Sequence, residues 1–324
     1  MNDGWPGSLL PTISEHLSVA QRVLVVAHIR PDGDAIGSVI GLGLALKETG
    51  KDVQMVLPDG VPANFRHLVG SEQVRTRSEG SFDFVIVLDC SDLERTGNAL
   101  NGRTPDLNID HHVTNLNFAR INLVDTNAVA TAEILAKLLT DLELPMPPTV
   151  LEALLTGIIT DTIGFRTSNM TSKALRVAAD LMERGAKLSE LYQRALGERS
   201  FEAVRFWGAG LNLLEREGRL VWTTLTLADR KSAGYSGRDD ADLINIISSI
   251  EGADIAIIFV EQPNGRVKVS WRAKAGFDVS RVALDFGGGG HPAASGAELW
   301  GNLEEVRLNV LQLTRLLLDK EETF

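Results

Sequence analysis

The sequence predicts a two-domain protein of the α/β class, with a parallel sheet in its N-terminal part, a helical connector, and a smaller α+β domain at the C-terminal end. Short apolar runs alternate with helical stretches up to residue 110, which is typical of parallel strands joined by crossover helices. The period becomes helical from Ala128 and returns to strand-like alternation after Gly218. A chain of 324 residues is long enough for two hydrophobic cores.

Four short apolar runs in the N-terminal part are predicted as strands. They are rich in β-branched residues and end at turn-forming or charged residues, which is the pattern of buried strands. We place them at residues 22–27, 53–57, 82–89 and 107–110. Helices are predicted on either side of the first strand, at 12–20 and 34–49.

The middle of the chain is predicted to be helical and the last third to be mixed. We expect helices at residues 129–142, 171–184, 188–196 and 200–214, with another that leads to Asp161. Strands are expected at 219–226, 254–260 and 266–272, with a hairpin turn at 262–265 and helices at 240–250 and 302–320. These elements divide the chain into a first domain (1–186), a helical connector (187–215) and a second domain (216–324).

Composition excludes several classes of protein. The net charge of -11 argues against binding along duplex DNA, which needs a broad basic surface. No apolar stretch is long enough to cross a bilayer, so no membrane association is expected. The N-terminal Met-Asn-Asp-Gly-Trp-Pro lacks the basic segment and apolar core of a signal peptide. The single cysteine, Cys90, excludes an intramolecular disulfide and favours the cytoplasm.

Histidines and carboxylates follow three of the predicted strands and one helix. These residues are His28, Asp32, Asp34, Asp89, Asp110, His111, His112 and Asp161. If the strands are adjacent and parallel, their carboxyl ends meet at one edge of the sheet. Carboxylates gathered there would repel one another, and divalent cations remove that penalty. Asp32 and Asp34 also have a simpler interpretation, as caps of the helix that follows them.

Two cations about 3.5–4 Å apart, bridged by a shared carboxylate, form a general arrangement for in-line displacement at phosphorus. The bridging water loses a proton near neutral pH and becomes the nucleophile. Imidazole and carboxylate ligands suit manganese, magnesium or zinc. We therefore expect a metal-dependent phosphoesterase.

The same residues carry a close resemblance to a known family. His28-x-x-x-Asp32-x-Asp34, Asp89, Asp110-His111-His112 and Asp161-Thr-x-x-Phe resemble the four motifs of the DHH phosphoesterase superfamily. Gly287-Gly-Gly-Gly-His291-x-x-Ala-Ser295-Gly296 resembles the glycine-rich signature of its associated C-terminal domain. Length and layout are similar to the NrnA-like enzymes, which hydrolyse very short RNA oligonucleotides (nanoRNA) and dephosphorylate pAp.

The resemblance implies a role for each motif residue. One metal would be held by His28, Asp32 and Asp89, and the other by Asp34, Asp89, His111 and Asp161. Asp89 would therefore bridge the two ions. Asp110 would hold a histidine in the required tautomer, and His112 would donate to a phosphate oxygen or to the leaving group. Manganese is the ion implied by the family, although the ligand types also suit magnesium.

The C-terminal domain is expected to hold the substrate. Arg272 and Lys274 are predicted to lie on one face of a strand, with Trp271 on the opposite face and in the core. Glycines without Cβ atoms let backbone N–H groups approach an anion. The expected substrate contacts are Arg272, Lys274, Gly288, Gly289, Gly290, His291 and Ser295.

Other functions stay open at this point. A phosphodiesterase acting on cyclic or linear dinucleotides, such as c-di-AMP or pApA, would use the same centre. A RecJ-type exonuclease is disfavoured because no basic or stacking channel is evident, and the glycine-rich signature disfavours a pyrophosphatase. A non-enzymatic nucleotide sensor would be marked by missing ligands, and none of the proposed ligands is missing. Whether the chain forms a homodimer is left open.

Overall fold

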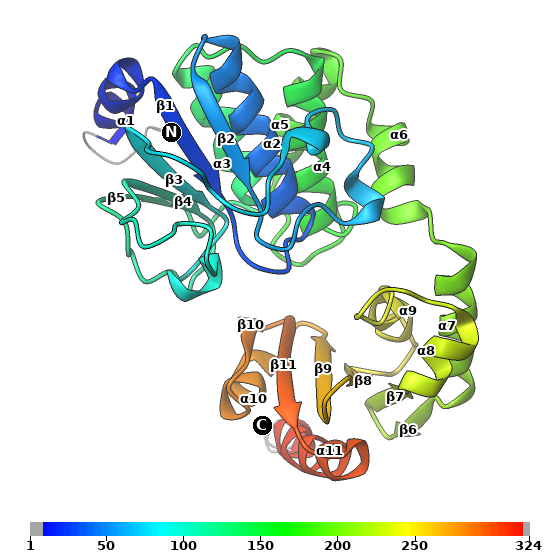
Figure 1. Ribbon diagram of the computed structural model, residues 1–324. Helices are drawn as coiled ribbons and strands as arrows, with labels where there is room; N and C mark the ends of the chain where they lie inside the picture. Colours follow the sequence, from blue (N-terminus) through cyan, green and yellow to red (C-terminus); the bar gives the residue numbers. More distant parts are fainter. Residues whose placement is uncertain (1–8, 320–324) are drawn as a thin grey trace. The chain divides into compact units, whose positions relative to one another are not determined.

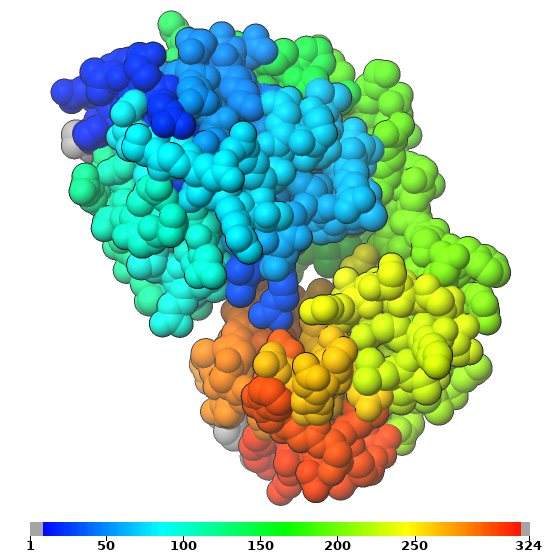
Figure 2. Space-filling model, viewed as in Figure 1, coloured from blue at the N-terminus to red at the C-terminus, as the bar shows by residue number. Residues whose placement is uncertain are grey.

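The structure, a computed structural model, describes residues 9–319. Residues 1–8, which include the segment read for a signal peptide, and residues 320–324 lie outside the described part. The chain divides into two compact units, Met1–Glu198 and Arg199–Phe324. In Figure 2 the first unit is coloured blue to green and the second green to red. Within residues 9–319, no helix combines the length and the apolar character needed to span a membrane.

The first unit is built on a five-stranded parallel sheet (Figure 1). Its strands are β1 (Arg22–Val26), β2 (Asp52–Val56), β3 (Phe84–Leu88), β4 (Leu107–Asp110) and β5 (Ile121–Val124). The spatial order is β2-β1-β3-β4-β5, and every pair is parallel. The register pairs Val26 with Val87 and Leu88 with Ile109. The carboxyl ends of β1, β3 and β4 are therefore neighbours at one edge.

The helices of the first unit share one apolar core with one face of this sheet (Figure 1). They are α1 (Leu9–Val19), α2 (Gly33–Glu48), α3 (Thr131–Asp141), α4 (Pro148–Asp161), α5 (Ser172–Glu183) and α6 (Leu188–Tyr192), with a π-helix at Gln193–Gly197. Short 3₁₀ turns lie at Ala63–Phe65, Ser71–Gln73 and Glu94–Thr96. The opposite face packs Leu24, Val26 and Val87 against Ala99 and Leu100. Both faces are thus covered, as parallel sheets require.

The second unit contains a six-stranded mixed sheet in the order β10-β11-β9-β8-β7-β6. The strands are β6 (Glu215–Glu217), β7 (Leu220–Leu225), β8 (Ile255–Gln262), β9 (Arg266–Ala273), β10 (Gly289–His291) and β11 (Ala294–Trp300). The helices are α7 (Phe201–Asn212), α8 (Leu227–Ala233), α9 (Leu243–Ile247), α10 (Val279–Asp285) and α11 (Leu303–Asp319). Separate apolar cores lie on the two faces of the sheet.

The predicted fold class is confirmed, and one expectation about it is wrong. Most predicted elements appear within a few residues of their expected limits, and Trp271 is fully buried as expected. Lys274 was expected on the same strand as Arg272, but β9 ends at Ala273. Lys274 is exposed one residue beyond it, and its backbone N–H donates to the Asp254 carbonyl. The chain turns here because Gly276 follows with φ 103°.

Candidate metal centre

The proposed ligands come from three strand ends and two helices of the first unit. His28 follows β1, Asp89 follows β3, and His111 follows β4. Asp34 lies in the first turn of α2, and Asp161 is the last residue of α4. The structure brings all five side chains together, because the strand ends are adjacent and α2 and α4 pack against each other.

Asp89 lies between two groups of potential ligands. Its Oδ2 is 3.4 Å from Nε2 of His28, and its Oδ1 is 3.7 Å from Nε2 of His111. Asp89 completes one group with His28 and Asp32 and another with Asp34 and His111, each with ligand atoms within 4.8 Å of one another. The two oxygens of this buried carboxylate therefore face two different sets of donors.

Backbone carbonyls fix the tautomers of two histidines. Nδ1 of His28 lies 2.8 Å from the Ile29 carbonyl oxygen, and Nδ1 of His111 lies 3.3 Å from that of Ala128. A carbonyl only accepts hydrogen bonds, so Nδ1 carries the proton in each ring. In the neutral form, Nε2 then keeps its lone pair and faces the carboxylates. This is the arrangement that metal-binding histidines adopt.

Asp32 is both a helix cap and a neighbour of His28. Its Oδ1 accepts from the backbone N–H groups of Asp34 and Ala35 at 3.1 and 3.0 Å, which makes it the N-cap of α2. Its Oδ2 is 3.8 Å from Nε2 of His28. The capping interpretation and the ligand interpretation are therefore compatible, because they use different oxygens.

Asp34 and Asp161 flank His111 on the other side of the centre. Oδ2 of Asp161 is 3.5 Å and Oδ2 of Asp34 is 4.0 Å from Nε2 of His111. Burial raises the pKa of Asp34 well above its usual value, and the charges of Asp89 and Asp161 raise it further. Burial also raises the pKa of Asp161 to about 7, despite the opposing effect of His111. Carboxylates this crowded are a donor set that divalent cations stabilise.

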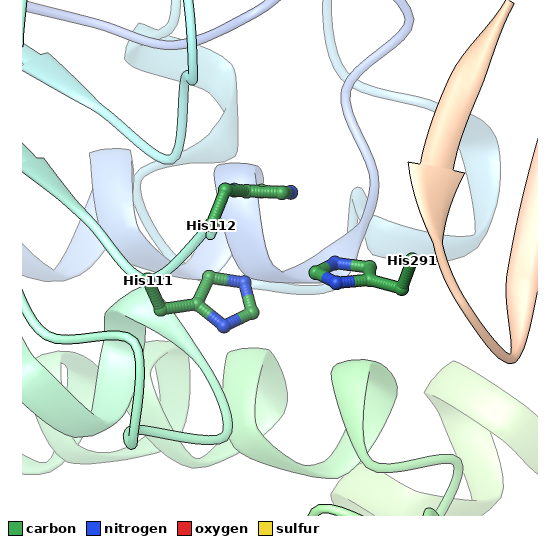
Figure 3. A group of neighbouring side chains, drawn as sticks. All are labelled: His111, His112 and His291. Atoms are coloured by element: carbon green, nitrogen blue, oxygen red, sulfur yellow. The ribbon is translucent and has the colours of Figure 1, made fainter. Parts of the chain in front are cut away.

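His112 is held by Asp110 at the end of β4. Nδ1 of His112 lies 2.7 Å from Oδ1 of Asp110, and the rings of His111 and His112 are tilted at 59° to each other (Figure 3). Burial lowers the pKa of His112, but the Asp110 hydrogen bond and the Asp89 charge outweigh it and raise the pKa to about 9. At neutral pH this imidazolium is a potential proton donor to an oxyanion.

The expected substrate residues lie in the second unit. Arg272 on β9 donates from Nε to Oδ1 of Asn245 at 3.3 Å and from Nη1 to its neighbour's carbonyl, that of Trp271. The Ser295 hydroxyl donates to the His291 carbonyl at 2.8 Å and thereby ties the β10–β11 turn together. These two side chains thus have structural partners as well as their proposed role.

Steric constraints divide the glycines of the glycine-rich segment. A Cβ on Gly288 would lie 2.2 Å from the Gly296 carbonyl oxygen, and one on Gly290 would lie 2.5 Å from that of Ala294. Close packing of residues 288–290 against β11 therefore requires glycine at positions 288 and 290. A Cβ on Gly289 would meet no atom within 4 Å. Packing gives no reason for glycine at position 289.

Two neighbours of the centre were missed by the sequence analysis. The Thr131 hydroxyl donates to Oδ1 of Asp89 at 3.1 Å, and the Asn115 amide donates to Oδ2 of Asp110 at 2.5 Å. Thr131 is the first residue of α3 and follows the N-cap residue Ala130, and no sequence signal links it to Asp89. No sequence signal links Asn115 to Asp110.

Comparison with known proteins agrees with this geometry. The model of the DHH family, N-terminal domain, matches residues 22–158, and that of the DHHA1 domain matches residues 220–314. The bifunctional oligoribonuclease and PAP phosphatase NrnA of Thermus thermophilus is 34% identical over 305 residues, which cover 92% of this chain and 90% of the relative. The chain belongs to the NrnA family of DHH proteins. This membership makes it a metal-dependent phosphoesterase.

Other relatives extend the likeness over both units. The NrnA of Bacillus subtilis is 27% identical and covers 88% of this chain and 91% of its own length. The crystal structure of an exopolyphosphatase-related protein from Bacteroides fragilis matches with a TM-score of 0.86 at 23% identity, over 97% of this chain and 96% of that one. That likeness shows that the NrnA-family chain shares its fold across nearly the whole length.

Proposed function

We propose that this chain hydrolyses short RNA oligonucleotides and removes a phosphate from pAp with the help of two divalent ions. The position of Asp89 carries the proposal, because its two oxygens face separate groups of ligands at 3.4 and 3.7 Å. A carboxylate shared in this way suits a pair of ions that activate a water molecule and neutralise the charge of a phosphate. The substrate class is supported by the relatives described as bifunctional oligoribonucleases and PAP phosphatases.

The residues have separate tasks in this proposal. His28, Asp32 and Asp89 would hold one ion, and Asp34, Asp89, His111 and Asp161 the other. The carbonyls of Ile29 and Ala128 orient the two ligand histidines. Buried ligands also keep bulk water away from the charges, which strengthens their interaction with the ions and the phosphate.

His112 would act on the substrate rather than on the ions. Its Nδ1 is held by Asp110, and in this proposal its Nε2–H donates to a phosphate oxygen or to the leaving oxygen. Asp110 itself accepts from the backbone N–H of His111 and from Asn115. This network holds the imidazole in one orientation and keeps it protonated.

An assay with several substrates tests the proposal. The protein would be incubated with pAp, a labelled RNA dimer, pApA, c-di-AMP and pyrophosphate, each with manganese and with a chelator. We expect release of product from pAp and from the RNA dimer that the chelator abolishes. Turnover confined to c-di-AMP and pApA would favour the dinucleotide phosphodiesterase. A relative at 22% identity, PdeA of Listeria monocytogenes, is a cyclic-di-AMP phosphodiesterase. No turnover of any compound would favour a nucleotide sensor.

The proposed substrate contacts have their own test. Arg272→Ala is expected to raise KM for pAp at least about tenfold, because one charge-assisted contact to phosphate is worth roughly 1.5–3 kcal/mol. A small artificial phosphodiester should be affected little. Arg281→Ala is the matched control, since that side chain is 79% exposed and pairs only locally with Asp278. Equal loss on both substrates would assign Arg272 to the fold instead.

Gly289 provides a second test of the same surface. Gly289→Ala fits without steric conflict, so a rise in KM would indicate that substrate approaches the backbone there. An unchanged KM would remove Gly289 from the proposed contacts.

We further propose manganese as the ion and, from the single buried Cys90, the reducing cytoplasm as the compartment.

A further inference from the structure

One short segment at the start of α3 contacts three of the proposed ligands. The Ala128 carbonyl faces Nδ1 of His111 at 3.3 Å. The backbone N–H groups of Thr131 and Ala132 donate to Oδ2 and Oδ1 of Asp34 at 2.6 and 2.9 Å. The Thr131 hydroxyl reaches Asp89. We call residues 128–133 the α3 entry segment.

Thr131 contacts two ligand carboxylates with two different groups. Its N–H donates to Asp34 and its hydroxyl donates to Oδ1 of Asp89 at 3.1 Å. Its side chain is fully buried among these carboxylates. An ionised carboxylate only accepts hydrogen bonds, so the hydroxyl proton must point towards Asp89.

This hydrogen bond restrains the rotation of the Asp89 carboxylate. With Oδ1 directed towards Thr131 and His111, Oδ2 is directed towards His28, 3.4 Å away. Rotation about the Cβ–Cγ bond would break the contact with the hydroxyl and move both oxygens away from their donors. Side chains of this kind normally have broad preferences about that bond. The bridging orientation therefore depends on an external restraint.

A buried acid, Glu133, holds the α3 entry segment in place. Oε2 of the buried Glu133 accepts from the backbone N–H of Val129 at 2.8 Å. Oε1 of Glu133 is 3.6 Å from Nζ of Lys173 on α5. A buried acid that closes the first turn in this way holds the backbone of residues 129–133 in place. Thr131 is thus presented from a rigid element.

We propose that Thr131 is a positioning residue, whose hydroxyl sets the orientation in which Asp89 can serve both metal ions. The proposal rests on the proposed two-metal function and adds a residue to it. It predicts that loss of the hydroxyl weakens both ion sites together, because Asp89 belongs to both groups of ligands. Partners of this kind typically contribute 10- to 100-fold to metal affinity or activity.

The test compares Thr131→Val, Thr131→Ser and Thr131→Ala in the full-length chain. Valine keeps the shape and the backbone N–H but lacks the hydroxyl, and serine keeps the hydroxyl. Manganese binding to the chelator-treated proteins would be measured by titration calorimetry, with circular dichroism as the check on folding. We expect at least a tenfold loss of affinity for Thr131→Val and recovery to within about threefold for Thr131→Ser.

Thr140→Val is the matched control. Thr140 lies on the same helix, but its hydroxyl bonds the Ala136 carbonyl and lies outside the ligand groups. We expect wild-type manganese affinity for it. If Thr131→Val does not fold, Thr131→Ala tests the same loss of the hydroxyl with less bulk, and the same loss of affinity is expected.

The outcomes separate this proposal from the proposed function. Wild-type affinity in folded Thr131→Val or Thr131→Ala, or equal losses in Thr131→Val and Thr131→Ser, would overturn the positioning role. A wild-type protein that binds two ions but leaves RNA and pAp intact would overturn the proposed function alone. The binding comparison between variants would still be readable in that case.

Discussion

Asp89 has a strained backbone at the point where the two ligand groups meet. Its φ is 51°, in the left-handed region that most residues avoid at a cost of about 1–2 kcal/mol. Aspartate tolerates this region better than residues with larger or branched side chains. The backbone N–H of Asp89 donates to the Ile109 carbonyl at 3.0 Å, which holds the conformation. Strain of this kind is characteristic of functional sites.

Asp89→Ala should remove nearly all turnover. The substitution takes away the carboxylate shared by both ligand groups, so neither group would hold its ion well. We expect kcat/KM for pAp to fall at least 100-fold at saturating manganese, as measured by phosphate release. Retention of a tenth of the wild-type rate would contradict the bridging role.

His112→Ala should separate chemistry from metal binding. We expect kcat to fall about 100-fold or more, since a positioned general acid contributes roughly 10²–10⁴ in rate. Manganese affinity should change by no more than about threefold, because Nδ1 of His112 is committed to Asp110. Equal loss of rate and of metal would reassign His112 as a ligand. Titration calorimetry beside steady-state kinetics distinguishes the two results.

The pH dependence of kcat should depend on Asp110. The hydrogen bond to Asp110 helps to raise the pKa of His112 to about 9, so the protonated donor is lost as the pH rises through that value. Asp110→Asn removes the charge while keeping the shape. The alkaline limb of the pH–rate profile should therefore move to lower pH. A limb that does not move would show that another group controls it.

At the scale of elements, α2 and α4 approach each other through glycines beneath the centre. A Cβ on Gly37 would lie 2.3 Å from the Ala153 carbonyl oxygen. A Cβ on Gly157 would lie 2.6 Å from Cβ of Ala132 and 2.8 Å from Oδ1 of Asp34. The spacing between these helices therefore sets where Asp34 and Asp161 can lie.

Gly37→Ala should destabilise the fold. The added methyl group meets backbone that cannot move independently, and overpacking of this kind costs about 1–3 kcal/mol. Gly208→Ala is the control, because Gly208 is inside α7 and its added methyl would meet nothing within 4 Å. There, alanine should stabilise by roughly 0.5–1 kcal/mol. Urea denaturation compares the two, and equal stabilities would contradict the packing argument.

At the scale of the whole molecule, part of the net charge of -11 lies in the buried carboxylates of the candidate metal centre. Oxygens of Asp34, Asp89 and Asp161 all lie within 4.0 Å of Nε2 of His111. The pKa of Asp161 is raised to about 7, and burial raises that of Asp34 as well. Metal binding must displace the protons that these raised pKa values retain.

Removal of metal should destabilise the protein more at pH 8 than at pH 6. The pKa of Asp161 is higher in the folded protein than in the unfolded chain. Its contribution to stability is therefore complete below the pKa of the unfolded state and is lost as the pH rises through about 7. The raised pKa of His112 acts in the same direction. We expect manganese to raise Tm more at pH 8, and binding near pH 6.5 to release protons. Calorimetry in buffers of different ionisation enthalpy measures that release, and Asp161→Asn should reduce it.

The sequence predicted elements best where one local pattern was strong. The apolar runs of β1, β3 and β4 are buried along their whole length or nearly so, and their period was unambiguous. β5 was missed because Asn122 interrupts a short, half-exposed edge strand. β10 was missed because Gly289 and Gly290 have low strand propensity. Pairing with β11, itself paired with β9, makes this segment a strand.

For this protein the sequence alone determined the parallel sheet, the gathering of histidines and aspartates at its edge, and the family. The sheet and the gathering of side chains follow from local periodicity and from the rule that parallel strands end together. The family follows from the resemblance of the motif residues. Tertiary structure alone decided that Thr131 lies against Asp89 and Asp34, which are 42 and 97 positions away along the chain. Such contacts depend on how α2, α3 and α4 pack against one another, and no local pattern encodes that packing.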